Sequence, residues 1–366
     1  MSVYPTVGVE EEFLLVDRRG GEPVACNSVV AQAAAARGVE LQLELTSCQV
    51  ETTTAVMSSS ADLRVELARL RNVAAAAAKS HGAQLLAVGL PPTVPHTFPV
   101  TTTARYGRIA DQFGMLAHEQ GICGCHVHVE VPSREVAIDV SNRLRPFLHL
   151  LLALSANSAI YREADSGYAS FRSILWARWP SAGPPPYFES PEHYDATVQS
   201  LLRAGAILDD GMVYWDVRPS AHFPTVEVRV CDVPATVGET VLLATLIRAA
   251  VMHAVEERER GHPAPRLEDG ALRAAYWKSS REGLDGMAVD LVDGFTIAPA
   301  GVLLAGLVEN LRSALERLDD YDMAREELAR IMERGNGAMR QRRAWSGSGK
   351  LASVISELSL STTTFE

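Results

Sequence analysis

The sequence predicts an α+β protein with a largely antiparallel sheet and helices on one face. First, the strand-like segments alternate apolar and polar residues instead of running continuously apolar, which is typical of antiparallel sheets that bury one face only. Second, no glycine-rich phosphate-binding loop of either common type follows a strand. The 366 residues, 47% of them hydrophobic, can form a large core, and we expect one domain over residues 1–366.

The expected elements follow from hydrophobic periodicity and from glycine and proline positions. Strands are expected over residues 6–16, 40–46, 84–90, 124–131, 213–218 and 224–231. Helices are expected over residues 62–80, 134–144, 147–157, 238–260, 300–318 and 322–334. The proline-rich residues 180–191 are expected to form a loop, because proline cannot sit in a central strand. A mostly helical part, about 237–345, is expected to pack on the sheet.

Charge and composition exclude several classes of protein. The net charge of −11 argues against nucleic acid and anionic membrane surfaces as main partners. The apolar run around 147–160 contains His149 and Asn157 and is too short to span a bilayer. No signal peptide is recognisable at the N-terminus. Five cysteines without a framework spacing predict reduced thiols and a cytoplasmic location.

Carboxylates gather on the polar face of the predicted sheet. Glu10 and Glu12 share one face of the first strand, roughly 6–7 Å apart, and Glu11 lies on the opposite face, where we expect it to reach solvent at the sheet margin. Glu44 points away from the leucines of its own strand. Glu51 follows a turn-like TSC segment, so it can face the same surface as Glu44.

Three later strands repeat this pattern, and their polar faces carry His126, His128, Glu130, Asp216, Arg218, Glu227 and Arg229. Any one such strand is more often a solvated sheet face. Together, however, these carboxylates would repel one another unless cations were present. Carboxylates with an imidazole and water are the ligands that magnesium and manganese prefer, so the sequence predicts a site for such ions.

Zinc is the alternative metal, because Cys123, Cys125, His126 and His128 lie within six residues. Alternation along the strand separates Cys125 from the two histidines, since it places the thiol on the apolar face. We therefore favour buried structural cysteines over a zinc site.

The order of the motifs resembles a known family. GVEEEFLLVD, GCHVHV, SANS, DSGYASFR, WDVRPS, FPTVEVRVCD and GNGAMRQR occur in the order found in type 2 glutamate–cysteine ligases and YbdK-type carboxylate–amine ligases. The resemblance covers residues 7 to about 342. It implies the catalytic fold of glutamine synthetase and the guanidino kinases, in which an antiparallel sheet curves around ATP and magnesium ions.

The resemblance also implies a chemistry. ATP would phosphorylate a substrate carboxylate, typically that of glutamate, and an amine, typically that of cysteine, would displace phosphate to form an amide. Two Mg²⁺ or Mn²⁺ ions would neutralise the triphosphate and the transferring phosphoryl group. The alternatives are a ligase of specialised metabolism with another acid and amine, a phosphotransferase that stops at the phosphorylated product, and a non-catalytic nucleotide- or metabolite-binding descendant.

The same resemblance assigns roles to individual residues. One metal would be held by Glu12, Glu44 and Glu51, and the other by Glu10, His126 and Glu227. Arg229 would contact the transferring phosphate or the acyl phosphate. Arg172 and Arg218 are the candidates for the substrate carboxylate, because a guanidinium can bind a carboxylate through two hydrogen bonds.

Two departures from the family pattern concern substrate choice. Glu130 stands where the family has a small residue, so we expect it to narrow the pocket or to repel an acidic substrate. Tyr161 and Arg162 stand near the expected pocket in the stretch after SANS. Substrates other than glutamate and cysteine therefore stay open.

Other residues are ambiguous in the sequence. His128 is either a partner of a metal ligand or a buried histidine, and Trp277 is expected in the core rather than stacked on a cofactor. Arg340, Arg342 and Arg343 are expected at a solvated surface, although they could reach phosphates. The family resemblance alone makes Asp165 and Tyr168 candidates for substrate contact. We expect a homo-oligomer, most simply a dimer.

Overall fold

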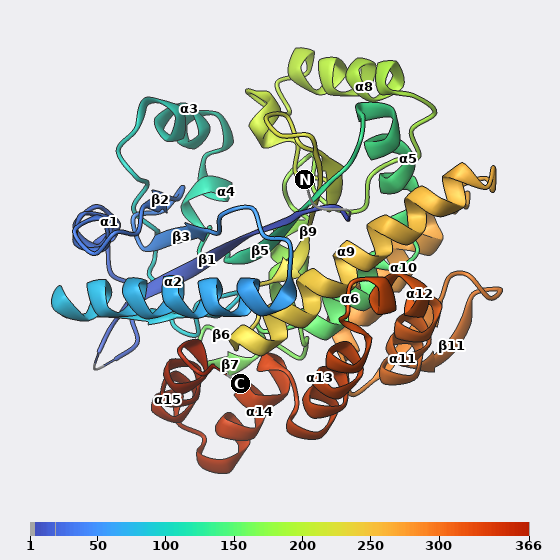
Figure 1. Cartoon of the computed structure of the whole chain (residues 1–366). Coiled ribbons are helices and arrows are strands. Elements are labelled where there is room, and N and C mark those ends of the chain that lie inside the picture. The colour runs from blue at the N-terminus through green and yellow to red at the C-terminus, as the bar shows by residue number, and fades with distance from the viewer. Residues whose placement is uncertain (1–3, 19, 366) are drawn as a thin grey trace.

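Seven strands form a single antiparallel sheet in the computed structural model, which describes residues 4–18 and 20–365 (Figure 1). Their order is β2-β3-β1-β5-β9-β8, and β4 also pairs with β1. The strands are β1 (Val7–Asp17), β2 (Leu41–Leu43), β3 (Gln49–Thr53), β4 (Ala83–Leu86), β5 (Gly124–Glu130), β8 (Val217–Pro219) and β9 (Thr225–Asp232). Two small hairpins lie apart from it: β6 (Ile160–Tyr161) with β7 (Ala164–Asp165), and β10 (Met287–Asp290) with β11 (Thr296–Pro299). The antiparallel α+β prediction is confirmed.

The helices are distributed along the whole chain. The first half carries α1 (Asn27–Ala35), α2 (Ser60–Ser80), α3 (Ala104–Phe113), α4 (Met115–His118), α5 (Arg134–Leu144), α6 (Leu148–Ser155) and α7 (Phe171–Trp176). The second half carries α8 (Pro191–Arg203), the 3-10 turn Asp210–Met212, α9 (Val237–Glu259), α10 (Asp269–Glu282), α11 (Ala300–Asn310), α12 (Arg312–Arg317), α13 (Tyr321–Arg334), α14 (Gly337–Ser348) and α15 (Leu351–Thr362).

Several predicted elements need correction. The strand expected over 213–218 covers only Val217–Pro219, and the strand expected over 84–90 ends at Leu86. The strand expected over 40–46 ends at Leu43, because the backbone then turns to other partners: Leu45 O accepts from Thr101 N, and Ser47 N donates to Pro99 O. The helix expected over 300–318 is interrupted at Leu311, which separates α11 from α12. The strand β3 had not been predicted.

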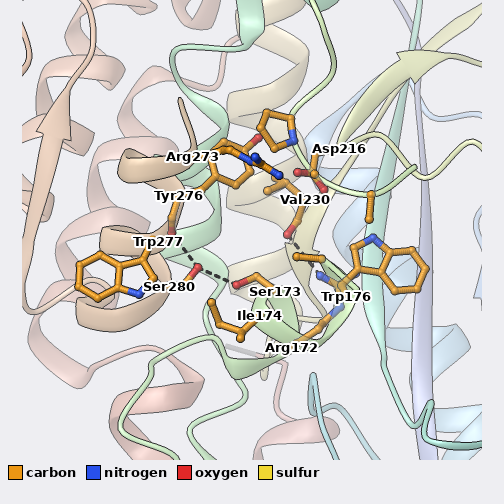
Figure 2. Close-up of a pocket in the computed structure, with 14 residues that line it drawn as sticks. Arg172, Ser173, Ile174, Trp176, Asp216, Val230, Arg273, Tyr276, Trp277 and Ser280 are labelled. Carbon is orange, nitrogen blue, oxygen red and sulfur yellow. Dashed lines mark hydrogen bonds between the residues drawn. The ribbon is translucent and has the colours of Figure 1, made fainter. Parts of the chain in front are cut away.

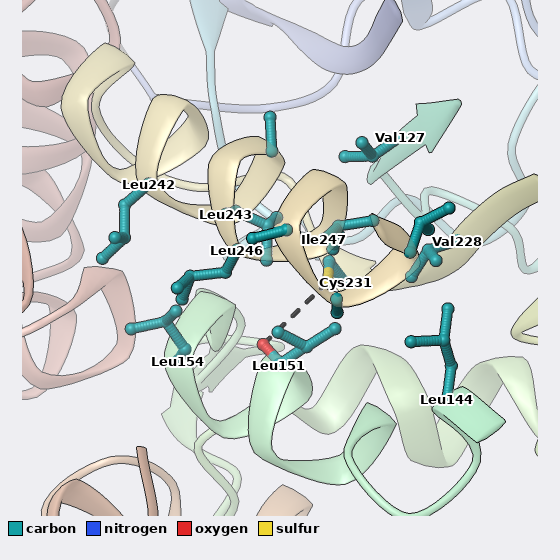
Figure 3. Packing of buried hydrophobic residues seen from close by; sticks show 14 of the residues in the cluster. Val127, Leu144, Leu151, Leu154, Val228, Cys231, Leu242, Leu243, Leu246 and Ile247 are labelled. Carbon is teal, nitrogen blue, oxygen red and sulfur yellow. Dashed lines mark hydrogen bonds between the residues drawn. The ribbon is translucent and has the colours of Figure 1, made fainter. Parts of the chain in front are cut away.

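The apolar side chains of the sheet pack against α9 and its neighbours. Valines of β5 and β9, such as Val127 and Val228, are fully buried against Leu243 and Ile247 of α9 (Figure 3). Helix α9 is long and apolar enough to cross a membrane by composition, but 94% of its apolar window is buried inside the protein. Burial in the core therefore accounts for its composition. The opposite face of the sheet keeps its polar side chains.

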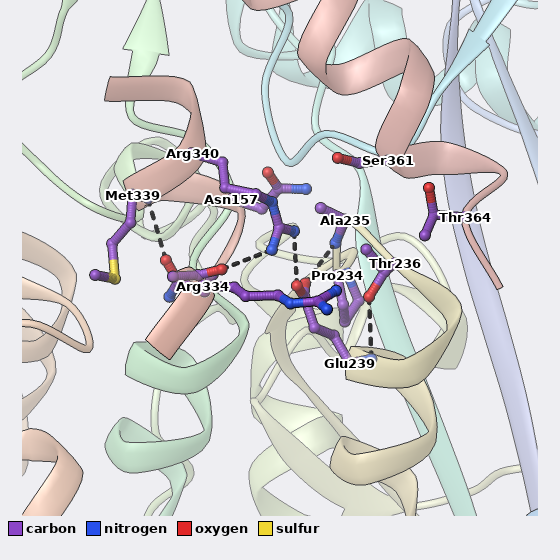
Figure 4. Close-up of polar contacts among 12 residues, drawn as sticks. Asn157, Pro234, Ala235, Thr236, Glu239, Arg334, Met339, Arg340, Ser361 and Thr364 are labelled. Atoms are coloured by element: carbon purple, nitrogen blue, oxygen red, sulfur yellow. Dashed lines mark hydrogen bonds and ion pairs between the residues drawn. The ribbon is translucent and has the colours of Figure 1, made fainter. Parts of the chain in front are cut away.

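The C-terminal helices are joined to α9 and the sheet by polar contacts. Arg340 of α14 donates to Glu239 of α9 over 2.6 Å, and the same carboxylate accepts from Ala235 N over 3.0 Å (Figure 4). Helix α15 packs on β4, and Thr362 Oγ1 accepts from Ala87 N. The helical part expected on the sheet thus extends beyond residue 345, whereas the single-domain organisation stays a prediction.

Glu11 lies on the core side of β1, not at the sheet margin where we had expected it. Its carboxylate is fully buried and forms a two-pronged ion pair with Arg71 of α2, with nitrogen–oxygen distances of 2.5 and 2.9 Å. Thr240 of α9 donates a further hydrogen bond of 2.7 Å. The pair joins β1, α2 and α9.

Candidate functional site

The strand register explains why carboxylates from distant parts of the chain meet. Glu12 of β1 lies opposite Glu51 of β3, and Glu10 lies opposite His126 of β5. Directly opposed residues in antiparallel strands have Cβ atoms about 4.5–5.5 Å apart. In the next strand pair, His128 lies opposite Glu227 of β9. The polar face therefore forms a continuous row across four strands.

Three of the carboxylates predicted as metal ligands lie close together. Glu12, Glu44 and Glu51 each place an oxygen within 4.8 Å of the others, close enough to share one ion. Glu44 reaches the group from the segment just after β2. The structure therefore brings together the three residues predicted to hold one metal.

The second predicted group is divided differently. Glu10 combines either with Glu51 and His126 or with His128 and Glu227, and in each combination the ligand atoms lie within 4.8 Å of one another. His126 and Glu227 do not belong to the same group. The register explains this, because Glu227 lies opposite His128 rather than His126. His128 thus joins the candidate ligands, a position that the sequence had left ambiguous.

The first group is electrostatically unfavourable when nothing positive lies between its members. Burial, followed by the charges of Glu44, Glu10 and Glu12, raises the pKa of Glu51 well above its usual range. Burial is also the main cause of the raised pKa values of Glu12 and Glu44. A divalent cation would offset this repulsion, and oxygen-rich groups of this kind suit magnesium or manganese.

The histidine is in a suitable state for a metal ligand. Burial and the charge of Arg229 lower the pKa of His126, so its imidazole is neutral near pH 7, as coordination requires. Its Nδ1 lies 3.1 Å from Glu10. Although burial opposes ionisation of Glu10, hydrogen bonds and charges from His126 and His128 lower its pKa below the usual range. The donor set therefore fits the predicted ions.

Two arginines flank the second group and converge on Glu227. Arg218 donates to Glu227 over 2.8 Å, and Arg229 bonds the other oxygen of the same carboxylate. Despite burial, these guanidinium groups keep the pKa of Glu227 well below its usual range. The buried Nε of Arg229 has no hydrogen-bond partner within residues 4–18 and 20–365. It is therefore free to bind an anion such as a phosphate oxygen.

A network of buried groups positions Arg172. The Asp232 carboxylate accepts from Ser158 and Ser170 over 2.7 and 2.8 Å and lies 3.7 Å from the Arg172 guanidinium. Ser158 Oγ in turn accepts from Arg172 N over 3.0 Å. A side chain at Gly124 would come within 2.4 Å of Arg172, so glycine leaves the space that this guanidinium occupies. The SANS, ASFR and VCD motifs meet in this network.

These groups surround one cavity of about 200 Å³. The predicted residues that line it are Glu10, Glu12, Glu44, Glu51, His126, Arg172, Arg218 and Arg229. Other lining residues had not been predicted and include Gln49, Arg105, Tyr106, Trp176, Trp179 and Tyr214. Most of these lie in loops or short helices, where strand alternation gives no signal. The N-cap residue Thr103 could have predicted the helix that carries Arg105.

The prediction that Glu130 lines this cavity is wrong. The Glu130 carboxylate accepts from the backbone N and Oγ1 of Thr6, over 3.2 and 2.9 Å, and is exposed at the end of β5. It borders a different depression, beside α9. Alternation placed the residue on the correct face, but the end of the strand turns its carboxylate away.

Other ambiguous residues also lie away from the cavity. Arg342 pairs with Asp165 over 3.2 Å, and Arg343 bonds the backbone of Arg334. Arg340 is largely buried in its contact with Glu239 rather than at a solvated surface. Trp277 is 53% exposed, so its expected core position is wrong.

The chain is similar to known proteins over nearly its whole length. The model of "Glutamate-cysteine ligase family 2(GCS2)" matches residues 6–357. The chain is 67% identical over 362 residues to "Putative glutamate--cysteine ligase 2-3" of Mycolicibacterium smegmatis, covering 99% of both chains. It is 58% identical to "Putative glutamate--cysteine ligase 2-1" of Nocardia farcinica, covering 98% of this chain and 93% of that one.

Solved structures share the fold at low sequence identity. A glutamate–cysteine ligase from Francisella tularensis, in complex with AMP, matches with a TM-score of 0.67 and 14% identity, covering 99% of this chain and 89% of that one. A bifunctional glutathione synthetase from Pasteurella multocida matches with a TM-score of 0.69 and 13% identity, covering 98% of this chain and 52% of that one. The family match over most of the chain shows that this protein belongs to glutamate–cysteine ligase family 2.

Proposed function

We propose that this protein is an ATP-dependent carboxylate–amine ligase that joins glutamate to an amine, with cysteine as the first candidate. One observation carries the proposal: the partly buried group Glu12, Glu44 and Glu51 lies in the same cavity as Arg172 and Arg229. Self-repelling carboxylates beside guanidinium groups whose Nε atoms lack a hydrogen-bond partner among the described residues suit a metal-bound polyphosphate. The AMP bound to the related Francisella tularensis ligase supports a nucleotide substrate.

The proposed reaction has two steps. The γ-phosphoryl group of ATP passes to a substrate carboxylate, which gives ADP and an acyl phosphate. The amine nitrogen then attacks the acyl carbon, a carbon–nitrogen bond forms, and the carbon–oxygen bond to phosphate breaks. Bound magnesium or manganese would neutralise phosphate charge during this transfer.

Residues of this chain would divide that work. Glu12, Glu44 and Glu51 would hold one ion, and Glu10 with the neighbouring histidines would hold the other. Arg229 would bind oxygens of the transferring phosphoryl group through its Nε, which has no hydrogen-bond partner in the part of the chain that the structure describes. Glu227 keeps Arg229 and Arg218 in place through the two ion pairs.

Product analysis tests the proposal. The protein is incubated with ATP, MgCl₂, glutamate and cysteine, and each amino acid is also omitted in turn. We expect ADP, phosphate and an amide in amounts that match, with amide only when both amino acids are present. Formation of AMP and pyrophosphate would overturn the mechanism. ADP formation that needs the acid alone, without an amide for any amine in a panel, would indicate a phosphotransferase instead.

A further inference from the structure

A second cavity lies directly beside the carboxylate cavity. Its volume is about 220 Å³, and it shares Arg172 and Trp176 with the first cavity (Figure 2). Its remaining walls come from α7, the loop before β8, strand β9 and one side of α10. A molecule in this cavity would therefore lie next to the site proposed for phosphoryl transfer.

A buried carboxylate stands in the wall of the second cavity. Asp216 is only 4% exposed and forms no ion pair with the residues that the structure describes. Its backbone is fixed on both sides, since Asp216 N donates to Gly183 O over 2.9 Å and Asp216 O accepts from Arg229 N over 2.7 Å. Burial raises the pKa of Asp216 to about 7, although Arg172, Tyr276 and Arg229 favour its ionised form. A cationic ligand would stabilise this carboxylate.

Positively charged groups with unused donor capacity line the same cavity. The buried Nε of Arg172 lacks a hydrogen-bond partner in the described part of the chain. Arg273 of α10 is exposed at this cavity and forms no hydrogen bond or ion pair with any described residue. Figure 2 shows Asp216, Arg273 and Tyr276 toward one end of the cavity. Buried polar groups are normally satisfied in folded proteins, so this cavity is incomplete without a polar ligand.

We propose that the second cavity binds the zwitterionic end of an α-amino acid. The ammonium group binds Asp216, the carboxylate group binds Arg273 and Arg172, and the aliphatic part packs beside Trp176. This inference rests on the proposed ligase function and deepens it by naming the ligand class of a specific subsite. Both proposed substrates are α-amino acids, so the acid and the amine share this chemistry.

The charges distinguish this ligand from a nucleotide base. A neutral base would leave the buried Asp216 without a direct ion-pair partner among the described residues, which is costly in a poorly solvated site. The triphosphate is negatively charged, as is the ionised Asp216. It is better matched to the first cavity, which contains arginines and the proposed metal ligands. An α-amino acid satisfies both signs of charge at once.

Binding to two variants tests the proposal. Asp216→Asn keeps the shape of the side chain and removes its charge, and Arg273→Gln changes an exposed residue that is not part of the core. Arg258→Gln is the control, because Arg258 is an exposed arginine of α9 outside both cavities. Equilibrium binding of L-glutamate, L-cysteine and ATP with MgCl₂ is measured separately on the full chain. Thermal unfolding shows that each variant is folded.

We expect at least one amino acid to bind about tenfold more weakly to both variants, as loss of a charged hydrogen bond predicts, while ATP affinity stays within about twofold. Glutarate and 3-mercaptopropionate lack the ammonium group, so Asp216→Asn should not weaken the binding of either one. Weakened glutamate binding would assign the cavity to the acid, and weakened cysteine binding would assign it to the amine. If Asp216→Asn does not fold, Arg273→Gln alone decides between these outcomes.

Three results would overturn the proposal: weaker binding of ATP alone, equal losses of glutamate and glutarate binding in Asp216→Asn, or no binding of either amino acid to the unmodified protein. The binding assay needs no turnover. Amino acid binding that depends on Asp216 in a protein that forms no amide would therefore refute the proposed ligase function and leave the subsite intact.

Discussion

Neighbouring carboxylates of β1 lie in opposite environments. On the core face, Glu11 is fully buried, but Arg71 and Thr240 satisfy its oxygens. On the polar face, Glu12 meets Glu44 and Glu51, and the backbone N of Gly124 is the donor bonded to its carboxylate over 2.7 Å. Glu11 and Glu12 are adjacent in β1, but their side chains point to opposite faces of the sheet. One carboxylate is therefore paired with an arginine, and the other lies in a group of like charges.

This difference separates structural charge from functional charge. A buried charge with a good partner holds elements together, and removing the partner leaves an uncompensated ion. A group of like charges costs stability in the absence of a ligand, and proteins keep such groups where a ligand supplies the opposite charge. The two faces of β1 should therefore respond in opposite ways to mutation.

The largest expected effect is on activity, from the polar face. Glu51→Gln removes a charge that the proposed metal needs, so turnover should fall by more than the roughly 100-fold typical of residues that only support a ligand. The free energy of unfolding without metal should stay the same or rise, because like-charge repulsion is reduced. Steady-state kinetics and denaturant titration measure both. Normal turnover would remove Glu51 from the metal site.

The next largest effect is on stability, from the core face. Arg71→Ala should lower the free energy of unfolding by about 3–5 kcal/mol, because it leaves the buried Glu11 charge unpaired. The double substitution Glu11→Met with Arg71→Met should lose less, because no charge is left behind. Denaturant unfolding of both variants checks this order. Equal losses would show that the ion pair does not dominate the stability of this region.

A smaller effect concerns pH and magnesium. Glu51 has a raised pKa in the folded state, so the native protein binds more protons than the unfolded chain at pH values above about 4.5. Stability without metal should therefore fall as pH rises through this range, and more in the unmodified protein than in Glu51→Gln. Magnesium at 100 times its dissociation constant should raise the free energy of unfolding by about 2.7 kcal/mol. At one fixed magnesium concentration, this increase should be larger at higher pH.

Thermal unfolding between pH 5 and 8, with MgCl₂ or with EDTA, measures this dependence. Glu51→Gln is the control for both pH and metal. A magnesium effect of the same size in the variant and in the unmodified protein would place the ion elsewhere.

Strand alternation predicted much of this site because the face on which a side chain lies depends only on its position within its own strand. Glu10, Glu12, His126 and Arg229 follow from side-chain parity on long strands, and the structure places all four at one cavity. Parity also predicted that Glu11 lies on the opposite face. It could not predict Arg71, since that partner comes from a helix 60 residues away.

Other features depend on register and chain ends, which the sequence does not reveal. Glu227 faces His128 because the β5–β9 register shifts between Cys125 and Val127, whereas the unshifted register would place Val129 opposite Glu227. Asp216 was predicted on the same face as Arg218, but it precedes β8 and lies at the second cavity, to which α10 brings Arg273 and Tyr276.

The smallest expected effect comes from Glu130, which extends the comparison to a third environment. It shares a strand face with His126 and His128, yet its carboxylate is exposed and bonded to Thr6. Glu130→Gln keeps the shape and removes a charge that neither a metal nor a buried partner uses. KM and kcat for both amino acids should stay within about twofold, and stability within about 0.5 kcal/mol, as for most surface substitutions. A changed preference across a panel of acids and amines would show that Glu130 does reach the substrate, which would contradict the position of its carboxylate at Thr6. No change would show that sharing a sheet face with metal ligands is insufficient, and that a carboxylate must also meet other carboxylates to serve the site.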